Sequence, residues 1–322
     1  MRNSWKVLVL VVLALAACGK PAAPTPEALN LPMGYVANVQ FSPFYVALER
    51  GYFTQANYAV TFDYRWETDG MQLVAAGQVP FTIASGDQVI QARSQGLPVV
   101  AVAAWFQRFP VAVISLQHEL RRPEDLRGLK IGVPATFGAS YIGLRALLNA
   151  GGLSEDDVEI QEIGYTQLAA LNAGTVDAAV VYANNEPVIL IQEGTPFSAL
   201  YVADYANLVS NVLVTNETMT KEHPERVRAF VQAFLQGLQD VLTADALSTL
   251  EVCKRYVEGL DQAQNATTQL AVLEATLDYW RTETPGRFDP ASWEQAQQVM
   301  LEAGLIQQTV PLESLFTNQF VP

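Results

Sequence analysis

Short apolar runs alternate with longer amphipathic stretches along most of this chain, a pattern typical of α/β proteins. The apolar runs have the length of buried strands, and the segments between them have room for helices. In chain order the predicted strands are one near residue 31 and then 60–64, 81–84, 99–104, 111–116, 130–133, 158–163, 178–181, 199–202 and 212–215.

Two helical regions carry clear local signals. The first opens at Ser42-Pro43, where serine suits the N-cap and proline the first helical position, and Gly51 marks its end. A long helical region follows the last predicted strand. Five apolar residues at helical spacing lie on one face of it: Val227, Phe230, Val231, Phe234 and Leu238.

A short internal repeat indicates two similarly built halves. Residues 76–81 (AGQVPF) lead into a strand followed by Ser85-Gly86-Asp87, and residues 173–178 (AGTVDA) lead into a strand followed by Asn184-Asn185-Glu186. About 300 residues follow the N-terminal segment, which is more than one hydrophobic core usually serves. We therefore expect two lobes.

The N-terminus has the features of an export signal. Arg2 and Lys6 precede an apolar run over residues 7–17, which is too short to span a bilayer. Residues 15–18 (LAAC) match the bacterial lipobox, in which the cysteine is acylated and the chain is cut before it. We expect residues 1–17 to be a signal peptide, Cys18 to carry a membrane-anchoring lipid, and the Pro- and Ala-rich residues 18–30 to be a linker. An ordinary signal peptide with an incidental cysteine is the alternative.

Composition narrows the possible functions. A net charge of −14 argues against nucleic acid as a partner, because phosphates require clustered Lys and Arg. If Cys18 carries lipid, Cys253 has no disulfide partner. The two histidines, His118 and His223, are far apart in the sequence, so no metal site is predicted, and no cofactor is expected.

Several blocks resemble the NMT1/THI5-like family of periplasmic binding proteins. They are residues 38–47 (NVQFSPFYVA) with 51–53 (GYF), 94–98 (SQGLP), 125–128 (DLRG) with 131–133 (IGV), and 173–178 (AGTVDA). The resemblance covers roughly residues 31–258. It implies an α/β type II periplasmic-binding-protein fold in which each lobe is a mostly parallel sheet flanked by helices. Lobe 1 would be discontinuous, with residues 31–116 and 215–322, and lobe 2 would hold residues 117–214.

Two further blocks point to one branch of that family. Residues 138–141 (GASY) and 182–187 (YANNEP) are more similar to the riboflavin- and thiamine-pyrimidine-binding branch than to the sulfonate-binding branch. The resemblance implies an extracytoplasmic protein that captures a small molecule and delivers it to an ABC permease with its ATPase. Riboflavin is the first choice of ligand, and a hydroxymethylpyrimidine or formylaminopyrimidine precursor of thiamine is the second.

Loops at the carboxyl ends of the strands supply the candidate site, since ligands of open α/β sheets bind there. The residues selected from these loops are rich in aromatic rings and amides, and none of them is Arg or Lys, which disfavours an anionic ligand. Gly86, Ala139 and Phe106 lie in the same loops. The predicted ligand-binding residues are Asn38, Gln40, Phe41, Trp66, Glu67, Ser85, Asp87, Trp105, Phe137, Gly138, Ser140, Tyr141, Tyr165, Tyr182, Asn184, Asn185 and Glu186.

Some of these residues have a second interpretation. Residues 138–141 open a helix whose free backbone N–H groups could hold a carbonyl, a hydroxyl or a phosphate, or Ser140 could simply cap that helix. Trp66 and Trp105 could stack on a ligand or fill the core. The sequence Tyr182–Glu186 has more polar side chains than a plain turn needs, which favours binding.

The fold implied by the resemblance also occurs in two other function classes, enzymes and sensors or scaffolds. The resembled family includes a pyrimidine synthase that consumes its own histidine and pyridoxal phosphate. Both histidines of this chain fall in polar segments away from the strand-end loops, so no enzyme is expected. A sensor or scaffold with the same fold stays open.

Overall fold

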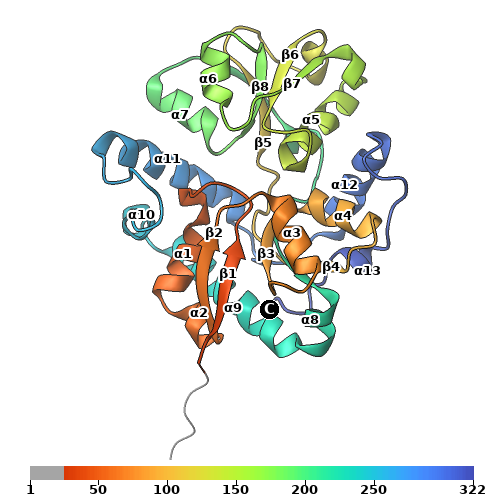
Figure 1. Cartoon of the computed structure of the whole chain (residues 1–322). Coiled ribbons are helices and arrows are strands. Elements are labelled where there is room, and N and C mark those ends of the chain that lie inside the picture. The colour runs from red at the N-terminus through yellow and green to blue at the C-terminus, as the bar shows by residue number, and fades with distance from the viewer. Residues whose placement is uncertain (1–24) are drawn as a thin grey trace, which may run out of the picture.

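The computed structural model describes residues 25–322, and the expected signal peptide and Cys18 lie outside them. Two α/β lobes face each other across a waist (Figure 1). Lobe 1, at the bottom of the figure, contains the first four strands and the last one: β1 (Glu27–Pro32), β2 (Tyr58–Asp63), β3 (Thr82–Ser85), β4 (Val99–Ala104) and β10 (Asn211–Asn216). Lobe 2 contains β5 (Val111–Ser115), β6 (Lys130–Val133), β7 (Glu159–Glu162), β8 (Ala178–Tyr182) and β9 (Ser198–Tyr201).

Helices cover the sheets of both lobes (Figure 1). Those of lobe 1 are α1 (Ser42–Glu49), α2 (Tyr52–Gln55), α3 (Glu67–Ala75), α4 (Gly86–Ser94), α8 (Glu217–Glu222), α9 (Pro224–Thr243), α10 (Ala246–Cys253), α11 (Ala263–Trp280), α12 (Pro290–Glu302) and α13 (Leu312–Leu315). Those of lobe 2 are α5 (Gly138–Ala150), α6 (Gln167–Asn172) and α7 (Glu186–Glu193). Short 3₁₀ helices are η1 (Val39–Phe41), η2 (Pro123–Leu126), η3 (Glu155–Asp157) and η4 (Val202–Asp204).

The sheets are mixed, whereas the sequence led us to expect mostly parallel ones. In lobe 1, β1 and β2 pair in parallel, but β10 runs antiparallel to both β3 and β4. In lobe 2 the strand order is β7-β6-β8-β5-β9; β6 is parallel to β7 and β8, and β5 is antiparallel to β8 and β9. The antiparallel strands β5 and β10 are the ones that enter each lobe from the other.

The chain crosses between the lobes earlier than expected. Strand β5 pairs with β8 and β9 of lobe 2, and β10 pairs with β3 and β4 of lobe 1, so the crossings lie in residues 105–110 and 205–210. The sequence had placed them near Leu116 and Val214. The error is one strand each time, because an apolar run does not reveal whether it is the last strand of one sheet or the first of the next.

Two local expectations also need correction. Residues 27–30, expected in the linker, belong to β1, in which Leu29 and Leu31 alternate inward and are buried. Ser42 lies inside α1 and does not cap it. Instead, the Asn38 side chain accepts a hydrogen bond from the backbone N–H of Gln40 (3.0 Å) and caps η1.

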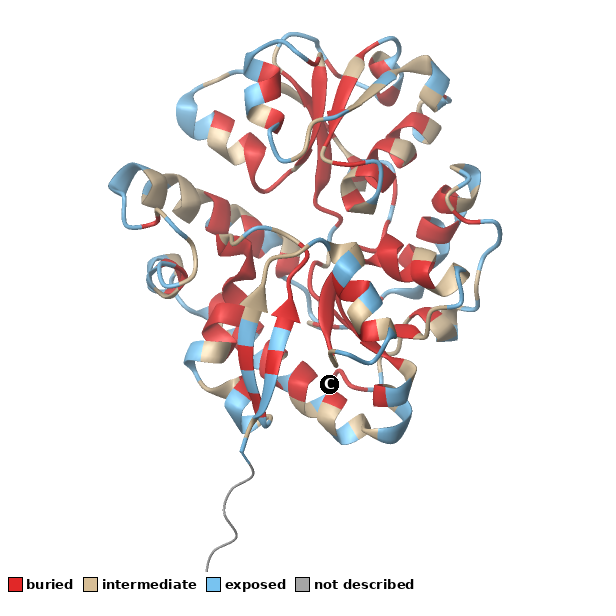
Figure 2. Cartoon of the chain, in the orientation of Figure 1, coloured by how far each residue is buried: buried red, intermediate tan, exposed pale blue. Residues whose placement is uncertain are grey.

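The core of lobe 1 follows the predicted helical face. Val227, Phe230, Val231, Phe234 and Leu238 are all fully buried on α9. Phe230 stacks on Phe81, with ring centroids 4.1 Å apart, and Phe234 stacks on Phe44 at 4.7 Å. Figure 2 shows this burial as red bands on the inner faces of helices and strands.

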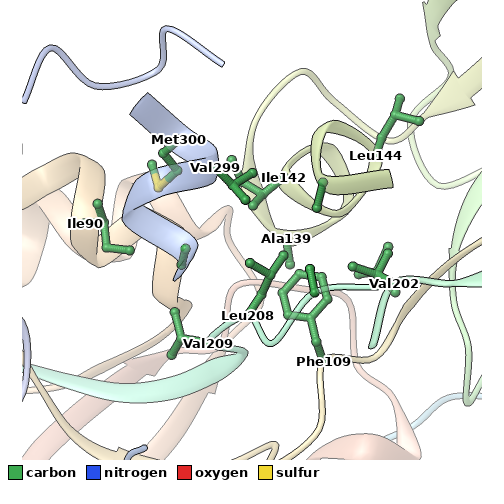
Figure 3. Packing of buried hydrophobic residues seen from close by; sticks show 14 of the residues in the cluster. Ile90, Phe109, Ala139, Ile142, Leu144, Val202, Leu208, Val209, Val299 and Met300 are labelled. Carbon is green, nitrogen blue, oxygen red and sulfur yellow. The ribbon is translucent and has the colours of Figure 1, made fainter. Parts of the chain in front are cut away.

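A second apolar cluster joins the lobes at the crossings. Phe109 comes from one crossing segment and Leu208 and Val209 from the other, and all three are buried. They pack in the cluster that also holds Ile142 of α5 and Val299 of α12 (Figure 3). Both connecting segments are therefore anchored in one continuous core.

Candidate ligand-binding site between the lobes

A cavity lies between the lobes and is lined by loops from both. Its volume, counted out to the open mouth, is about 870 Å³. Lobe 1 and the first crossing segment supply Met33, Gly34, Tyr35, Gln40, Phe41, Trp66, Glu67, Trp105, Phe106 and Asn211. Lobe 2 supplies Pro134, Ala135, Phe137, Gly138, Ala139, Ser140, Tyr165, Gln167, Tyr182, Asn185 and Glu186.

Most of the predicted residues meet at this cavity, although they come from six separate stretches of the chain. Parallel strands present their carboxyl ends at the same edge of a sheet, and the two lobes turn those edges toward each other. The predicted residues in the lining are Gln40, Phe41, Trp66, Glu67, Trp105, Phe137, Gly138, Ser140, Tyr165, Tyr182, Asn185 and Glu186. Their role in binding stays a prediction.

Trp105 forms part of one wall and is also part of the core. It stacks on Phe41, with ring centroids 5.3 Å apart and ring planes 27° apart, and on Trp280 at 6.2 Å. Only 3% of Trp105 is exposed, and its indole N–H has no hydrogen-bond partner. The two interpretations of Trp105 are therefore compatible, since Trp105 packs in the core and also belongs to the cavity lining.

Aromatic rings from the two lobes touch each other at the same cavity. Trp66 of lobe 1 stacks on Tyr165 of lobe 2 (centroids 5.2 Å, planes 23° apart) and meets the edge of Phe137 at 5.7 Å. Tyr35 of lobe 1 meets Tyr165 edge-on at 4.6 Å. Trp66, Phe137 and Tyr165 are each about 40% exposed, so these rings lie at the solvent side and bridge the lobes.

Glu186 is a buried carboxyl group in the lobe 2 wall. It opens α7, where one carboxyl oxygen accepts a hydrogen bond from the backbone N–H of Tyr182 (3.0 Å). The other accepts from Nδ2 of Asn185 (3.1 Å), which leaves Oδ1 of Asn185 buried without a partner. Burial raises the pKa of Glu186 to about 7, because no cation compensates the lost hydration.

Glu67 is the corresponding acid of lobe 1. Its Oε2 accepts a hydrogen bond from Oγ of Ser85 at 2.6 Å. Burial, and to a lesser extent repulsion by Asp87, raises the pKa of Glu67 to about 7. Both walls thus present a carboxyl group that is partly protonated near neutral pH and can either donate or accept a hydrogen bond.

Ser85 and Asp87 were predicted in the site, but they lie behind Glu67 and do not line the cavity. Ser85 is fully buried and Asp87 is 3% exposed. Asp87 accepts from Nε2 of Gln88 (3.2 Å), and burial raises its pKa to about 6. The side chains turn inward because Ser85 ends β3, which is buried along its whole length, and Asp87 lies in the buried first turn of α4.

Three more predicted residues face away from the cavity. Asn38 caps η1, as described above. The Tyr141 hydroxyl donates to Glu155 and accepts from Arg145 (3.3 Å) on the flank of α5. Asn184 is fully buried, and its Nδ2 donates to Oγ1 of Thr276 in α11 at 2.8 Å. A strand-end position places a residue near the site, but the local backbone decides which way its side chain points.

The cavity also includes residues that sequence reasoning missed. Met33, Gly34 and Tyr35 directly follow β1, Pro134 and Ala135 follow β6, and Gln167 opens α6, so the strand-end rule could have found them. Asn211 could not be found in that way. It begins β10, and because β10 is antiparallel to its neighbours, its amino end lies at the edge where their carboxyl ends lie. Its Oδ1 accepts from the Tyr182 hydroxyl (3.3 Å) across the lobes.

The cavity lining is acidic and rich in aromatic rings. It contains two carboxyl groups and no Lys, Arg or His.

Within residues 25–322 no group of three or more His, Cys, Asp or Glu side chains is arranged to hold a metal ion. The same range contains no helix that is both long and apolar enough to cross a membrane.

Comparison with known proteins gives the family. The family model described as NMT1/THI5-like matches residues 38–245, which include most of the cavity lining from both lobes. The riboflavin-binding protein RibY of Chloroflexus aurantiacus is 38% identical over 98% of this chain and 96% of its own length. The chain belongs to the NMT1/THI5-like family.

Further similarities fit this assignment. The formylaminopyrimidine-binding protein of Halalkalibacterium halodurans is 30% identical over 98% of this chain and 99% of its own length. Among solved structures, the alkanesulfonate-binding protein SsuA of Xanthomonas axonopodis shares the fold with a TM-score of 0.71, covering 92% of this chain and all of its own, at 17% identity. The two-lobed α/β fold of periplasmic binding proteins, expected from the sequence, is confirmed.

The two histidines lie away from the cavity. His118 follows β5 on the surface of lobe 2, where its Nε2 is 3.5 Å from Asp177. His223 sits between α8 and α9 in lobe 1. Neither lines the cavity, so no histidine is placed where a bound heterocycle would meet it.

Proposed function

We propose that this protein is the extracytoplasmic solute-binding component of an ABC importer and that it captures riboflavin between its lobes. The observation that carries the proposal is the composition of the interlobe cavity. Aromatic rings line it from both lobes, amides and two carboxyl groups lie among them, and no cationic side chain is present. The similarity to RibY supports the choice of ligand.

The cavity offers suitable partners for each part of a flavin. Trp66, Phe41 and Trp105 provide apolar faces for a three-ring system. Its carbonyls and ring N–H need donors and acceptors, and the two buried polar atoms of the lining without a partner are one of each: the indole N–H of Trp105 and Oδ1 of Asn185. The ribityl hydroxyls can donate to Glu67 or Glu186. A ligand that satisfies these atoms gains affinity, because buried unpaired polar atoms are costly.

A thiamine pyrimidine precursor is the second candidate ligand. An aminopyrimidine would donate its amino group to a carboxyl such as Glu186 and stack on one ring. The similarity to the formylaminopyrimidine-binding protein favours it. Riboflavin ranks first because aromatic rings line the cavity from both lobes, whereas a single small ring needs fewer of them.

We further propose that Cys18 carries a lipid that anchors the mature protein to the cell membrane. The lipobox-like residues 15–18 support this, and along the sequence only a short Pro- and Ala-rich stretch separates Cys18 from Glu27, where β1 begins. The ligand would be released to a permease and its ATPase when the lobes, which we divide at residues 105–110 and 205–210, move apart. The relatives named above are binding proteins, and the position of both histidines gives no support to an enzyme.

Direct binding tests the proposal. Purified protein mixed with riboflavin should remain yellow after desalting and should quench flavin fluorescence at one ligand per chain. Adding excess formylaminopyrimidine should leave the flavin bound. Tight pyrimidine binding with no flavin response would exchange the two candidates, and binding of neither would reject the proposal.

A further inference from the structure

Outside the cavity lining, the two lobes also share a buried polar contact. Helix α11 packs against α10 and η1 of lobe 1 and also against α7 of lobe 2, beneath which it lies in Figure 1. At that contact Nδ2 of Asn184 donates to Oγ1 of Thr276 at 2.8 Å. Both side chains are completely buried.

The hydroxyl group of Thr276 can act only as the acceptor in this hydrogen bond. Its hydroxyl donates to the backbone carbonyl of Val272, one helical turn earlier, at 2.6 Å. Since the only hydrogen of the hydroxyl is used within the helix, Oγ1 has only acceptor capacity left, and the matching group on Asn184 is its Nδ2. Oδ1 of Asn184 has no hydrogen-bond partner, so the bond to Thr276 is the single hydrogen bond that the Asn184 side chain makes.

The turn that holds Asn184 lines the cavity, and α11 packs behind a residue that lines it. Asn184 belongs to the turn between β8 and α7, in which Tyr182, Asn185 and Glu186 line the cavity while Asn184 faces away. One turn beyond Thr276, Trp280 stacks on Trp105, which lines the other side. The hydrogen bond therefore joins the outer sides of two cavity walls without reaching the ligand space.

We propose that Asn184 and Thr276 form a latch that holds the lobes closed and thereby sets ligand affinity without contact with the ligand. This rests on the proposed function, in which the lobes close on a solute. When the lobes separate, water replaces both partners, so the bond contributes only to the closed state. A group with this role changes the population of closed protein and hence the apparent affinity.

Thr276→Val tests the latch, because it replaces the hydroxyl by a methyl group of similar size and leaves Nδ2 of Asn184 buried and unpaired in the closed state. Riboflavin affinity should fall by about 5- to 100-fold, mainly through faster dissociation. Thr276→Ser keeps the hydroxyl and should restore most of the affinity. In a double-mutant cycle, Asn184→Ala should add little to Thr276→Val.

The melting temperature of the ligand-free protein distinguishes a latch from a contact that only stabilises the fold. The latch exists only in the closed form, so Thr276→Val should lower the melting temperature of the ligand-free protein less than that of the riboflavin-saturated protein. An equal fall with and without ligand, or unchanged affinity in Thr276→Val, would overturn the latch.

An interlobe distance tests the latch even if riboflavin is not the ligand. Spin labels at Glu193→Cys in α7 and Leu247→Cys in α10, both exposed positions on different lobes, report closure, while the native Cys253 is buried. Thr276→Val should reduce the closed population of the ligand-free protein, and Thr276→Ser should not. If the distances respond but riboflavin does not bind, the proposed function fails and the latch stands. If riboflavin binds and Thr276→Val changes neither distance nor affinity, the latch fails alone.

Discussion

Replacing Glu186 by glutamine removes a buried carboxyl group from the cavity wall and keeps its shape. The carboxyl has a pKa of about 7 in the folded protein, compared with 4.5 when unperturbed. Between these two pH values the folded protein binds more protons than the unfolded chain, so the free energy of unfolding decreases as pH rises. Above pH 7 the charged group therefore destabilises the fold by about 3 kcal/mol, the equivalent of that pKa difference.

The glutamine variant should lose this dependence. Its new amide can still accept from Tyr182 N–H and can donate to Asn185 once the Asn185 amide rotates and turns its unpartnered Oδ1 toward it. At pH 8 the variant should be more stable than the parent protein by up to about 3 kcal/mol, and at pH 4.5 the two should be nearly equal.

Urea unfolding of the ligand-free protein at pH 4.5 to 8 measures this difference. Glu193→Gln is the matched control, since it makes the same chemical change at the exposed end of the same helix. A difference between Glu186→Gln and the parent that is constant across pH, or largest at pH 4.5, would refute the reasoning. So would an equal response in the control.

Three further predictions follow from burial and charge. Trp105→Ala should lower the free energy of unfolding by about 3–5 kcal/mol, because Trp105 is buried. Trp66 is exposed, so Trp66→Ala should lower the free energy of unfolding by less than about 1 kcal/mol while still weakening riboflavin binding. Equal losses of stability in denaturant titrations of the two variants would contradict this. Riboflavin 5′-phosphate should bind at least ~100-fold more weakly than riboflavin in a calorimetric titration, since the phosphate would meet two carboxyl groups and no cation; similar affinities would reject the acidic description of the cavity. Cys18→Ala should move the protein from the membrane fraction to the soluble extracytoplasmic fraction, and a variant that stays with the membrane would exclude lipid at Cys18 as the anchor.

Sequence patterns located the strands well, because each one is a compact apolar run. Strands β4 and β6 match their predicted bounds, and most others differ by one or two residues. The patterns did not indicate which strands pair with each other in a sheet. The runs that became β5 and β10 were assigned to the wrong lobes, and the antiparallel direction of β10, which brings Asn211 to the cavity, is a property of the assembled sheet.

The candidate site was predictable to the level of loops and not to that of side chains. The strand-end rule selected the turn that contains Asn184, Asn185 and Glu186 because its position depends only on the sheet. Within that turn, Asn185 and Glu186 line the cavity while Asn184 binds Thr276, which lies 92 residues away. The choice between adjacent amides depends on α11, and no local pattern encodes where that helix will lie.

A structure determined with riboflavin present tests the central claim most directly. We expect one flavin in the interlobe cavity, with its rings against Trp66, Phe41 or Trp105 and polar contacts to Asn185 and to a carboxyl group from at least one lobe. Both lobes should contact the same molecule. A flavin bound outside the cavity, or an empty cavity at saturating riboflavin, would contradict it.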